Sequence, residues 1–344
     1  METLRKGELA EEVLRSYFLE QGYFVVRSLP LSYGQIDITD IDLWLYGKTS
    51  PFTRERINVD IKNKTDPRAF ERIIWAKGLQ VSLNLERCLV ATASIKKEAR
   101  EFALANDVIF IDGNFLKTLT TKIKNTDRIT EELFLSEISY ENFEKSNNEW
   151  KKKYTASKVR LLNKFNFDGC NEYLREINYF MEQSIFRSSN TLIPLRLLYF
   201  NIACFLICLD FLSKSFIPLN QNLRKELLIN GFNYGERGKE NTENITNAAI
   251  KLASSVIANP GMARTLQMEV EKQTKERPVN ILADFFCKDT HLNFLFEAAK
   301  LFESFSYSPV ITAPSELPVE LQSIIGLLSD FFRVDRKKIF TSFF

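Results

Sequence analysis

The sequence has few of the residues that build the commonest zinc and nucleophilic sites. It contains one histidine, His291, and five cysteines, none of which forms a Cys-x-x-Cys pair. A histidine-based zinc site or a Ser-His-Asp triad would have to rest on His291 alone, and neither a cysteine zinc site nor a disulfide framework is expected. An isolated histidine beside an apolar segment is more often structural, so we expect any catalysis to use carboxylates and lysines.

The sequence also lacks the features of a membrane span or an export signal. The most apolar window, residues 197–209, is too short to cross a bilayer and lies between Arg196 and Asp210. A buried helix is predicted there, with Cys204 and Cys208 packed in the core. The N-terminal residues METLRKGELAEE lack the apolar core of a signal peptide. We therefore expect a cytoplasmic protein, as the scattered cysteines suggest, and no contact with a membrane.

Overall charge does not identify a partner. The chain has 344 residues, with 46 Lys and Arg against 44 Asp and Glu, and a formal net charge of +2. This balance neither predicts nor excludes binding of nucleic acid, which requires a local basic surface. The length predicts two domains.

Periodicity predicts an α/β domain over residues 1–120. The expected helices are 3–21, 68–84 and 95–107, and the expected strands are 23–28, 39–47, 57–64, 88–93 and 108–112. This order, α-β-β-β-α-β-α-β, is typical of a domain with a central mixed sheet.

The character of the sequence changes after residue 120. Residues 121–155 are polar and charged, which predicts a linker or an exposed helix. An all-helical domain is predicted over residues 156–344. Its expected helices lie near 170–187, 193–214, 221–230, 241–257, 263–274, 279–287, 290–305 and 316–332.

Two neighbouring predicted strands carry the chemically distinctive residues. Asp60 and Lys62 are two positions apart, so they share one face of their strand, and Asp42 can join them from the paired strand. Two carboxylates and an ammonium on one sheet face can hold a divalent metal ion and direct a water molecule at a phosphate. The plainer alternative is an exposed ion pair across two strands.

The Asp-x-Lys tripeptide is weak evidence on its own. A chain of this length contains about one such match by ordinary residue usage. Glu149-Trp150-Lys151 and Asp335-Arg336-Lys337 also fit the wider (Asp/Glu)-x-Lys pattern, but neither ends an apolar alternating strand. Ile57, Val59 and Ile61 are expected to pack on the face opposite Asp60, which gives this match its structural context.

Further residues carry a resemblance to a known family. Gly7, Glu11, an apolar helix face, Gly22 and a strand that ends in Arg27-Ser28 precede the Asp42, Asp60 and Lys62 set. Together they resemble the restriction-endonuclease-like, or PD-(D/E)XK, nuclease superfamily, with a core like those of Mrr-like restriction enzymes and archaeal Holliday junction resolvases.

The later part of the predicted α/β domain adds to this resemblance. The segment CLVATASIKKEAREFALANDVIFIDGNFL, which contains the Asp112-Gly113 turn, is similar to the last part of Mrr-like domains. The resemblance covers residues 1–120. Ile41 replaces the proline of the family pattern, and Asp60 stands where glutamate is commoner.

The resemblance implies a restriction-endonuclease-like fold and a nuclease dependent on Mg²⁺ or Mn²⁺. Asp42, Asp60 and the Ile61 carbonyl would supply hard oxygen ligands, and Glu11 would complete the shell or bind a second ion. Lys62 would orient the attacking water or neutralise developing charge. Glu8 and Glu12 are alternatives to Glu11.

Basic residues near the expected site suggest contacts with nucleic acid. We expect these contacts from Arg27, Ser28, Lys64 and Arg68. Arg54, Arg56, Arg72 and Lys77 belong to the same group, for which ordinary surface charge is the alternative.

The most specific expected function is that of a DNA endonuclease, with defence against foreign DNA suggested by analogy of architecture. The helical domain would mediate homodimerisation or bind a partner protein. Two alternatives remain open: a non-catalytic nucleic-acid-binding or assembly subunit that keeps the fold, and a nuclease acting on RNA or on branched DNA.

Overall fold

The computed structural model describes residues 4–34, 36–63, 68–122, 127–140, 149–186, 192–256 and 277–341, and the isolated positions 265, 268, 269 and 272. The chain divides into two compact units. The first, here called the sheet unit, comprises Met1–Asn163 and Ala299–Ile311. The second, here called the helical unit, comprises Lys164–Ala298 and Thr312–Phe344.

The sheet unit follows the element order predicted from the sequence. Its strands are β1 (Phe24–Tyr33), β2 (Ile36–Lys48), β3 (Arg54–Lys62), β4 (Arg87–Thr92) and β5 (Ile109–Ile111). Its helices are α1 (Lys6–Glu20), α2 (Ala69–Ser82), α3 (Lys97–Ala105), α4 (Gly113–Lys122), α5 (Glu131–Tyr140) and α6 (Glu149–Asn163), with the end of α13 (Asp289–Ser306).

The five strands form one mixed sheet in the order β1-β2-β3-β4-β5. β1, β2 and β3 are antiparallel neighbours, whereas β3, β4 and β5 are parallel. The parallel pairs need crossover connections, which α2 and α3 provide. The predicted hairpin of β2 and β3 is confirmed.

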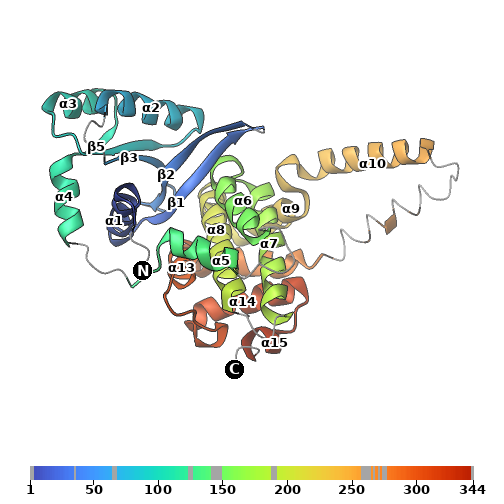
Figure 1. Ribbon diagram of the computed structural model, residues 1–344. Helices are drawn as coiled ribbons and strands as arrows, with labels where there is room; N and C mark the ends of the chain where they lie inside the picture. The colour runs from blue at the N-terminus through green and yellow to red at the C-terminus, as the bar shows by residue number, and fades with distance from the viewer. Residues whose placement is uncertain are drawn as a thin grey trace. The chain divides into compact units, whose positions relative to one another are not determined.

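Helices cover both faces of the sheet (Figure 1). α1 and α4 pack on one face, where Leu14, Leu43, Val59, Ile61 and Leu116 share a core. On the other face, α2 and α3 pack over β4, with Ile73, Ala76, Cys88, Val90 and Ala103 in a second core. Ile57, Val59 and Ile61 therefore point to the α1 face, as predicted from their alternation with polar residues.

The predicted turn at Asp112-Gly113 is the start of α4. The Asp112 carboxylate accepts the backbone N–H groups of Asn114 at 3.1 Å and Phe115 at 3.0 Å, so it caps the helix. Gly113 passes so close to Ala93, the residue after β4, that a Cβ atom would lie 2.3 Å from the Ala93 carbonyl oxygen. Only glycine fits this approach without a shift of the backbone.

The sheet unit extends past the expected boundary at residue 120. Residues 121–155 were expected to form a linker or an exposed helix, but α5 and α6 bury Phe134, Trp150 and Tyr154 completely. Tyr307, from the segment after α13, stacks against Phe134 with the ring centroids 4.7 Å apart. These large aromatic side chains explain why a polar stretch is part of a core rather than a connector.

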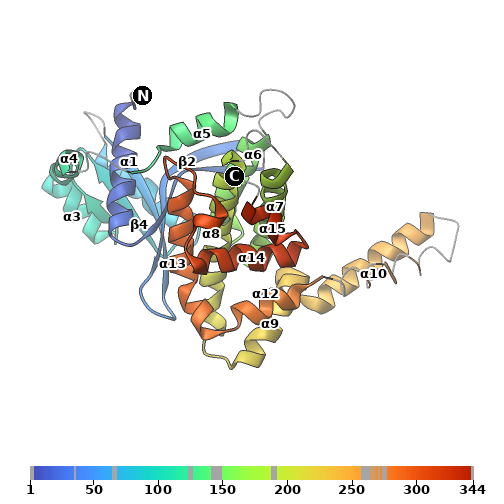
Figure 2. The ribbon, with the colours of Figure 1, turned by 90° about the horizontal axis from the view of Figure 1, so that it is seen from below.

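Every described element of the helical unit is a helix. They are α7 (Phe167–Phe186), α8 (Leu192–Phe216), α9 (Gln221–Tyr234), η1 (Gly235–Arg237), α10 (Gly238–Val256), α12 (Val279–Phe286), the start of α13, η2 (Pro314–Glu316), α14 (Val319–Phe332) and α15 (Arg336–Thr341). Figure 2 shows α9 beside α12, and α10 projecting from them. The helix expected at 263–274 lies almost entirely outside the described residues.

Helix α8 is the central helix of this unit. At 25 residues it is longer than its apolar window suggested, and it is long and apolar enough to cross a membrane by those two criteria. However, 89% of its most apolar 18-residue window is buried inside the protein, as in a core helix. Cys204 and Cys208 are fully buried on it, which confirms their predicted packing role.

His291 has a structural environment in the helical unit. Its Nδ1 lies 2.7 Å from the Phe285 carbonyl oxygen, and its ring stacks on that of Phe285 with the centroids 3.7 Å apart. These contacts join the first turn of α13 to the end of α12.

Candidate functional site

The candidate site lies where β2 and β3 separate. Their pairing ends at Leu43 and Val59, but β2 continues along β1 and β3 continues along β4 as far as Lys62. Figure 1 shows the β1–β2 hairpin extending beyond β3. This fork leaves backbone groups of β3 without a neighbouring strand on one side, and Asp42 and Asp60 lie at its two edges.

Asp42 fills the fork from the β2 side. Its Oδ2 accepts the backbone N–H of Ile61 at 2.6 Å, which replaces the lost strand pairing. Burial raises the pKa of Asp42, while the Ile61 N–H and the charges of Arg72 and Lys62 act in the opposite direction. The carboxylate of Asp42 is thus anchored to the main chain between Asp60 and Lys62.

Asp60 lies on the face of β3 that α2 covers. It is 6% exposed, and Arg72 from α2 donates Nε–H to its Oδ2 at 2.7 Å, with a second contact from Nη2 to Oδ1. The neighbouring Asn58 donates to the Ala76 carbonyl of α2 at 3.1 Å. The expectation that Asn58 and Asp60 share one face is confirmed, and Arg72 supplies the positive charge that two nearby carboxylates require.

Lys62 ends β3 beside this pair. Its side chain is half-buried, and its charge lowers the pKa of Asp42. Among the residues that the structure describes, none forms an ion pair with the Lys62 ammonium. With respect to the described residues, the Lys62 ammonium is therefore available to a ligand at the fork.

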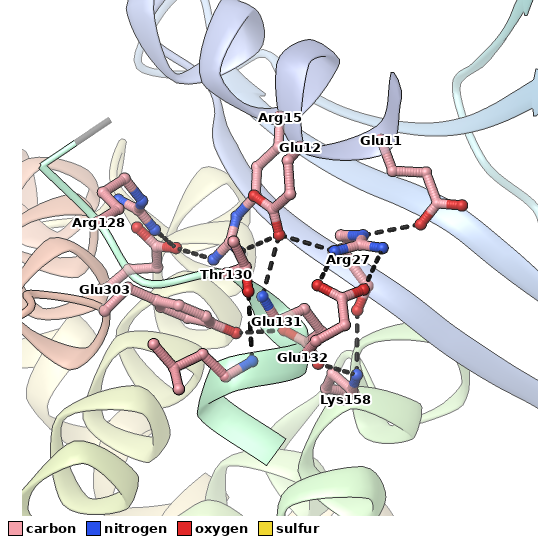
Figure 3. A network of polar contacts seen from close by, with 12 residues as sticks. Glu11, Glu12, Arg15, Arg27, Arg128, Thr130, Glu131, Glu132, Lys158 and Glu303 are labelled. Atoms are coloured by element: carbon pink, nitrogen blue, oxygen red, sulfur yellow. Dashed lines mark hydrogen bonds and ion pairs between the residues drawn. The ribbon is translucent and has the colours of Figure 1, made fainter. Parts of the chain in front are cut away.

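Glu11 approaches from the opposite face of the sheet. It projects from α1, where its Oε2 accepts the Nε–H of Arg27 at 2.7 Å. Arg27 also donates to Glu12 at 2.7 Å and to Glu132 of α5 at 2.6 Å, so one guanidinium serves three carboxylates (Figure 3).

This imbalance of charge affects the titration of Glu11. Burial raises its pKa from 4.5 to about 7, against the lowering effect of Arg27, and the charges of Asp42 and Glu132 raise it further. The influence of Asp42 shows that Glu11 and the fork are electrostatically coupled, although Glu11 and Asp60 point from opposite faces.

A second buried group of charges lies next to Arg27 in the sheet unit (Figure 3). Glu131, which is 1% exposed, accepts hydrogen bonds from Tyr154 at 2.9 Å and Tyr307 at 2.8 Å. Lys158 donates to Glu131 at 2.7 Å and to the Arg27 carbonyl at 3.0 Å. Burial alone would raise the pKa of Glu131, but the charges of Lys158 and Arg15 and the hydrogen bonds from Lys158 and Tyr307 outweigh it, so the pKa is lowered.

The structure corrects part of the expected nucleic-acid surface. Arg27 is only 2% exposed and is engaged by carboxylates, so it cannot contact a phosphate in this arrangement. Arg68 precedes α2 with a largely exposed side chain 3.5 Å from Glu71. Ser28 is half-buried with φ at 54°, and Lys64 lies outside the described residues.

The other expected basic contacts are engaged within the protein. Arg54 is 4% exposed and donates to the Ser50 carbonyl at 2.6 Å, and Arg56 is 8% exposed and pairs with Glu86 at 3.0 Å. Lys77 lies 3.8 Å from Asp107.

The donor set is limited in this arrangement. Within the described residues, no group of three His, Cys, Asp or Glu side chains is close enough to hold a metal ion together. The structure brings Asp42 to the Ile61 backbone and Lys62 near Asp42, but it holds Asp60 on Arg72 and Glu11 on Arg27.

Sequence reasoning missed the roles of Arg72 and Glu132. The role of Arg72 has a sequence signal, since α2 connects two parallel strands and its first turn must lie near the end of β3. Arg72 also directly precedes Ile73 on the buried face of α2. Glu132 is 105 positions from Arg27, and no local pattern links the two residues.

The chain was compared with models of protein families, with curated proteins and with solved structures, and none of them matches it.

Proposed function

We propose that the protein is a metal-dependent nuclease that hydrolyses phosphodiester bonds, with a restriction-endonuclease-like sheet unit and DNA as its substrate. The observation that supports this most is the fork between β2 and β3. Two acidic residues from separating strands, a main-chain segment and Lys62, which pairs with no carboxylate among the described residues, come together there, with Asp42 Oδ2 2.6 Å from the Ile61 nitrogen.

The donors at the fork fit Mg²⁺ or Mn²⁺ in their chemistry. The Asp42 and Asp60 carboxylates and the Ile61 carbonyl are hard oxygen ligands, and Mg²⁺ is commonly held by one or two carboxylates, with water and substrate phosphate completing its shell. A third acidic ligand is therefore not required. A bound cation would acidify water and offset negative charge on the attacked phosphate.

The protein groups have distinct parts in this proposal. Asp42 and Asp60 provide the negative charge that holds the cation, and Arg72 competes with the cation for Asp60. Lys62 orients the attacking water and balances charge on the phosphate. Glu11, on the opposite face of the sheet and bound to Arg27, does not contact the substrate in this proposal; with a pKa of about 7 it changes charge near neutral pH and so alters the field at Asp42.

One observation favours a second candidate, a non-catalytic nucleic-acid-binding or assembly subunit. Arg72 already neutralises Asp60, which has a bidentate arginine partner instead of an exposed oxygen pair. In a catalytic protein this ion pair yields to a cation, whereas in a structural protein it persists.

Cleavage assays separate these two functions. Purified protein is incubated with plasmid, linear and branched DNA and with RNA, in Mg²⁺, Mn²⁺ or EDTA. We expect EDTA to abolish cleavage and Lys62→Ala to lower its rate by roughly 100-fold or more. Lys117→Ala, which removes an exposed lysine of α4, is the matched control and should cleave at the wild-type rate.

Three results would contradict the nuclease proposal. Cleavage in the presence of EDTA would show that the reaction does not need a metal ion. Equal cleavage rates for Lys62→Ala and Lys117→Ala would show that the fork does not take part in the reaction. Binding of nucleic acid without cleavage of any substrate, unchanged by Asp60→Asn, would support the non-catalytic candidate instead.

A further inference from the structure

The helical unit contains a large cavity that the nuclease proposal does not use. Its volume is about 1100 Å³, and it opens between α7, the end of α9, η1, the start of α12 and the end of α14. Sites for small molecules usually measure about 300–1000 Å³, so this cavity is large enough for a ligand of nucleotide size.

Arginines from three separate elements line the cavity. Arg175 lies on α7, Arg237 on η1, and Arg277 two residues before α12, and all three are exposed. Within the described part of the chain, none of their guanidinium groups has an ion pair or a hydrogen bond. Arginine presents a planar fork of donors that matches phosphate oxygens, so three of them around one cavity suit a ligand with several negative charges.

The two acidic side chains that line the cavity, Asp168 and Glu172, have partners within the protein. Glu172 pairs with Lys164, which also lines the cavity. Asp168 accepts the backbone N–H of Glu236 at 3.3 Å, and Glu236 accepts that of Phe167 at 3.0 Å. These reciprocal bonds fix η1 against the start of α7. A hydrogen-bonded carboxylate keeps its charge, but Lys164 and the three arginines of the lining outnumber Asp168 and Glu172, so the cavity carries a net positive charge.

Two asparagines that line the cavity each have a buried amide oxygen that accepts no hydrogen bond from the described residues. These are the Oδ1 atoms of Asn178 and Asn233, while the Asn178 amide nitrogen donates to Glu182 at 3.1 Å. Buried acceptors are rarely left unsatisfied, and the N–H groups of a nucleobase are suitable donors for them.

Aromatic side chains complete the lining. Tyr234, Phe331 and Phe332 are half-buried at the cavity, and the last two rings pack edge to face with their centroids 5.0 Å apart. Partly exposed aromatic rings provide surfaces on which a nucleobase stacks.

From these three features together, we infer that this cavity binds a free nucleotide with two or more phosphate charges. The arginines hold the phosphates, the two amide oxygens accept base N–H groups, and an aromatic ring stacks on the base. This site is separate from the fork and does not depend on the nuclease proposal.

Calorimetric titration of the 344-residue chain tests the inference. The probes are ATP, GTP, CTP and UTP, with tripolyphosphate, the free nucleosides and a short oligodeoxynucleotide as comparison ligands. EDTA is present throughout, and the Asp60→Asn protein is titrated alongside the wild type, so that neither cleavage nor the fork contributes to the result. We expect at least one nucleotide to bind more tightly than its nucleoside, than tripolyphosphate and than the oligodeoxynucleotide.

Matched variants locate the binding. Arg175→Gln, Arg237→Gln and Arg277→Gln should each weaken binding of that nucleotide by roughly tenfold or more. Lys288→Gln removes one positive charge from an exposed position outside the cavity and should leave the affinity unchanged. Far-UV circular dichroism checks that these surface substitutions leave the fold intact.

Several outcomes would overturn the inference. These are no binding of any nucleotide, tripolyphosphate binding as tightly as the best nucleotide, tighter binding of the oligodeoxynucleotide, or equal effects of the arginine and Lys288 substitutions. Any of them leaves the nuclease proposal untouched, because cleavage is measured separately.

Discussion

Replacing Glu11 with glutamine should flatten the pH dependence of the stability of the sheet unit. Burial and neighbouring carboxylates raise the pKa of Glu11 from 4.5 to about 7, and only 20% of its side chain is exposed. At 1.36 kcal/mol per pH unit, this shift corresponds to roughly 3 kcal/mol as an upper bound.

The direction follows from proton binding. Between about pH 4.5 and 7, the folded protein keeps a proton on Glu11 that the unfolded chain has lost. The stabilisation by protonated Glu11 is therefore complete below pH 4.5 and is lost as the pH rises through 7. Glu11→Gln lacks this pH dependence. Relative to the wild type, its free energy of unfolding should therefore rise by up to about 3 kcal/mol between pH 4.5 and 7.

Tryptophan fluorescence during urea unfolding measures this difference in unfolding free energy for the sheet unit. The three tryptophans of the chain, Trp44, Trp75 and Trp150, all belong to the sheet unit. Glu20→Gln, at the exposed end of the same helix, is the control for loss of one carboxyl group. If the difference between Glu11→Gln and wild type stays constant within about 0.5 kcal/mol over this window, the assignment of the charge imbalance to Glu11 is wrong.

Three further substitutions test the packing around the site, each by urea unfolding with tryptophan fluorescence. Arg72→Met should lower the free energy of unfolding by roughly 2–3 kcal/mol, because it leaves the buried carboxylate of Asp60 unpaired. Adding Asp60→Asn should restore part of this loss, and no restoration would mean that the two residues are not coupled. Glu131→Gln should cost roughly 3–5 kcal/mol at neutral pH. The pKa of Glu131 is lowered in the folded protein, so the difference in unfolding free energy between wild type and Glu131→Gln should shrink as the pH falls through that lowered pKa. A difference that stays constant would contradict an ionised Glu131. Gly113→Ala should cost roughly 1–3 kcal/mol, since its Cβ would meet a backbone oxygen at 2.3 Å, whereas Gly7→Ala meets nothing within 4 Å and should not destabilise; equal effects would argue against the close approach.

The sequence predicted most of the sheet unit because its signals are local. Alternation in β2 and β3 identified the hairpin and placed Ile57, Val59 and Ile61 opposite Asn58 and Asp60. The short helices α5 and α6 were missed as core elements because their segment is polar on average. Their buried side chains, such as Trp150 and Tyr154, are few and widely spaced, and their partner Tyr307 comes from a segment more than 150 residues later.

The candidate site was predictable in its residue types but not in its contacts. Strand pairing implied that Asp42 and Asp60 would be neighbours, and they lie at the two edges of the fork. The sequence gives no measure of competition between partners, so it did not show that Arg72 would take Asp60 and that Arg27 would take Glu11. Arg27 was expected to contact nucleic acid, but its side chain is buried among three carboxylates. One of these, Glu132, comes from a helix that was not predicted to be nearby.

The shared guanidinium of Arg27 links helix α5 to the candidate site. Glu11 and Glu132 bind different nitrogens of the same side chain, at 2.7 Å and 2.6 Å, and the charge of Glu132 helps to raise the pKa of Glu11. A shift of α5 that withdraws Glu132 would leave Arg27 more fully available to Glu11, and the pKa of Glu11 would fall. The protonation state of Glu11 near neutral pH therefore depends on a helix outside the first 120 residues, so a fragment cut at residue 120 would differ from the intact chain in both the stability and the charge of its candidate site.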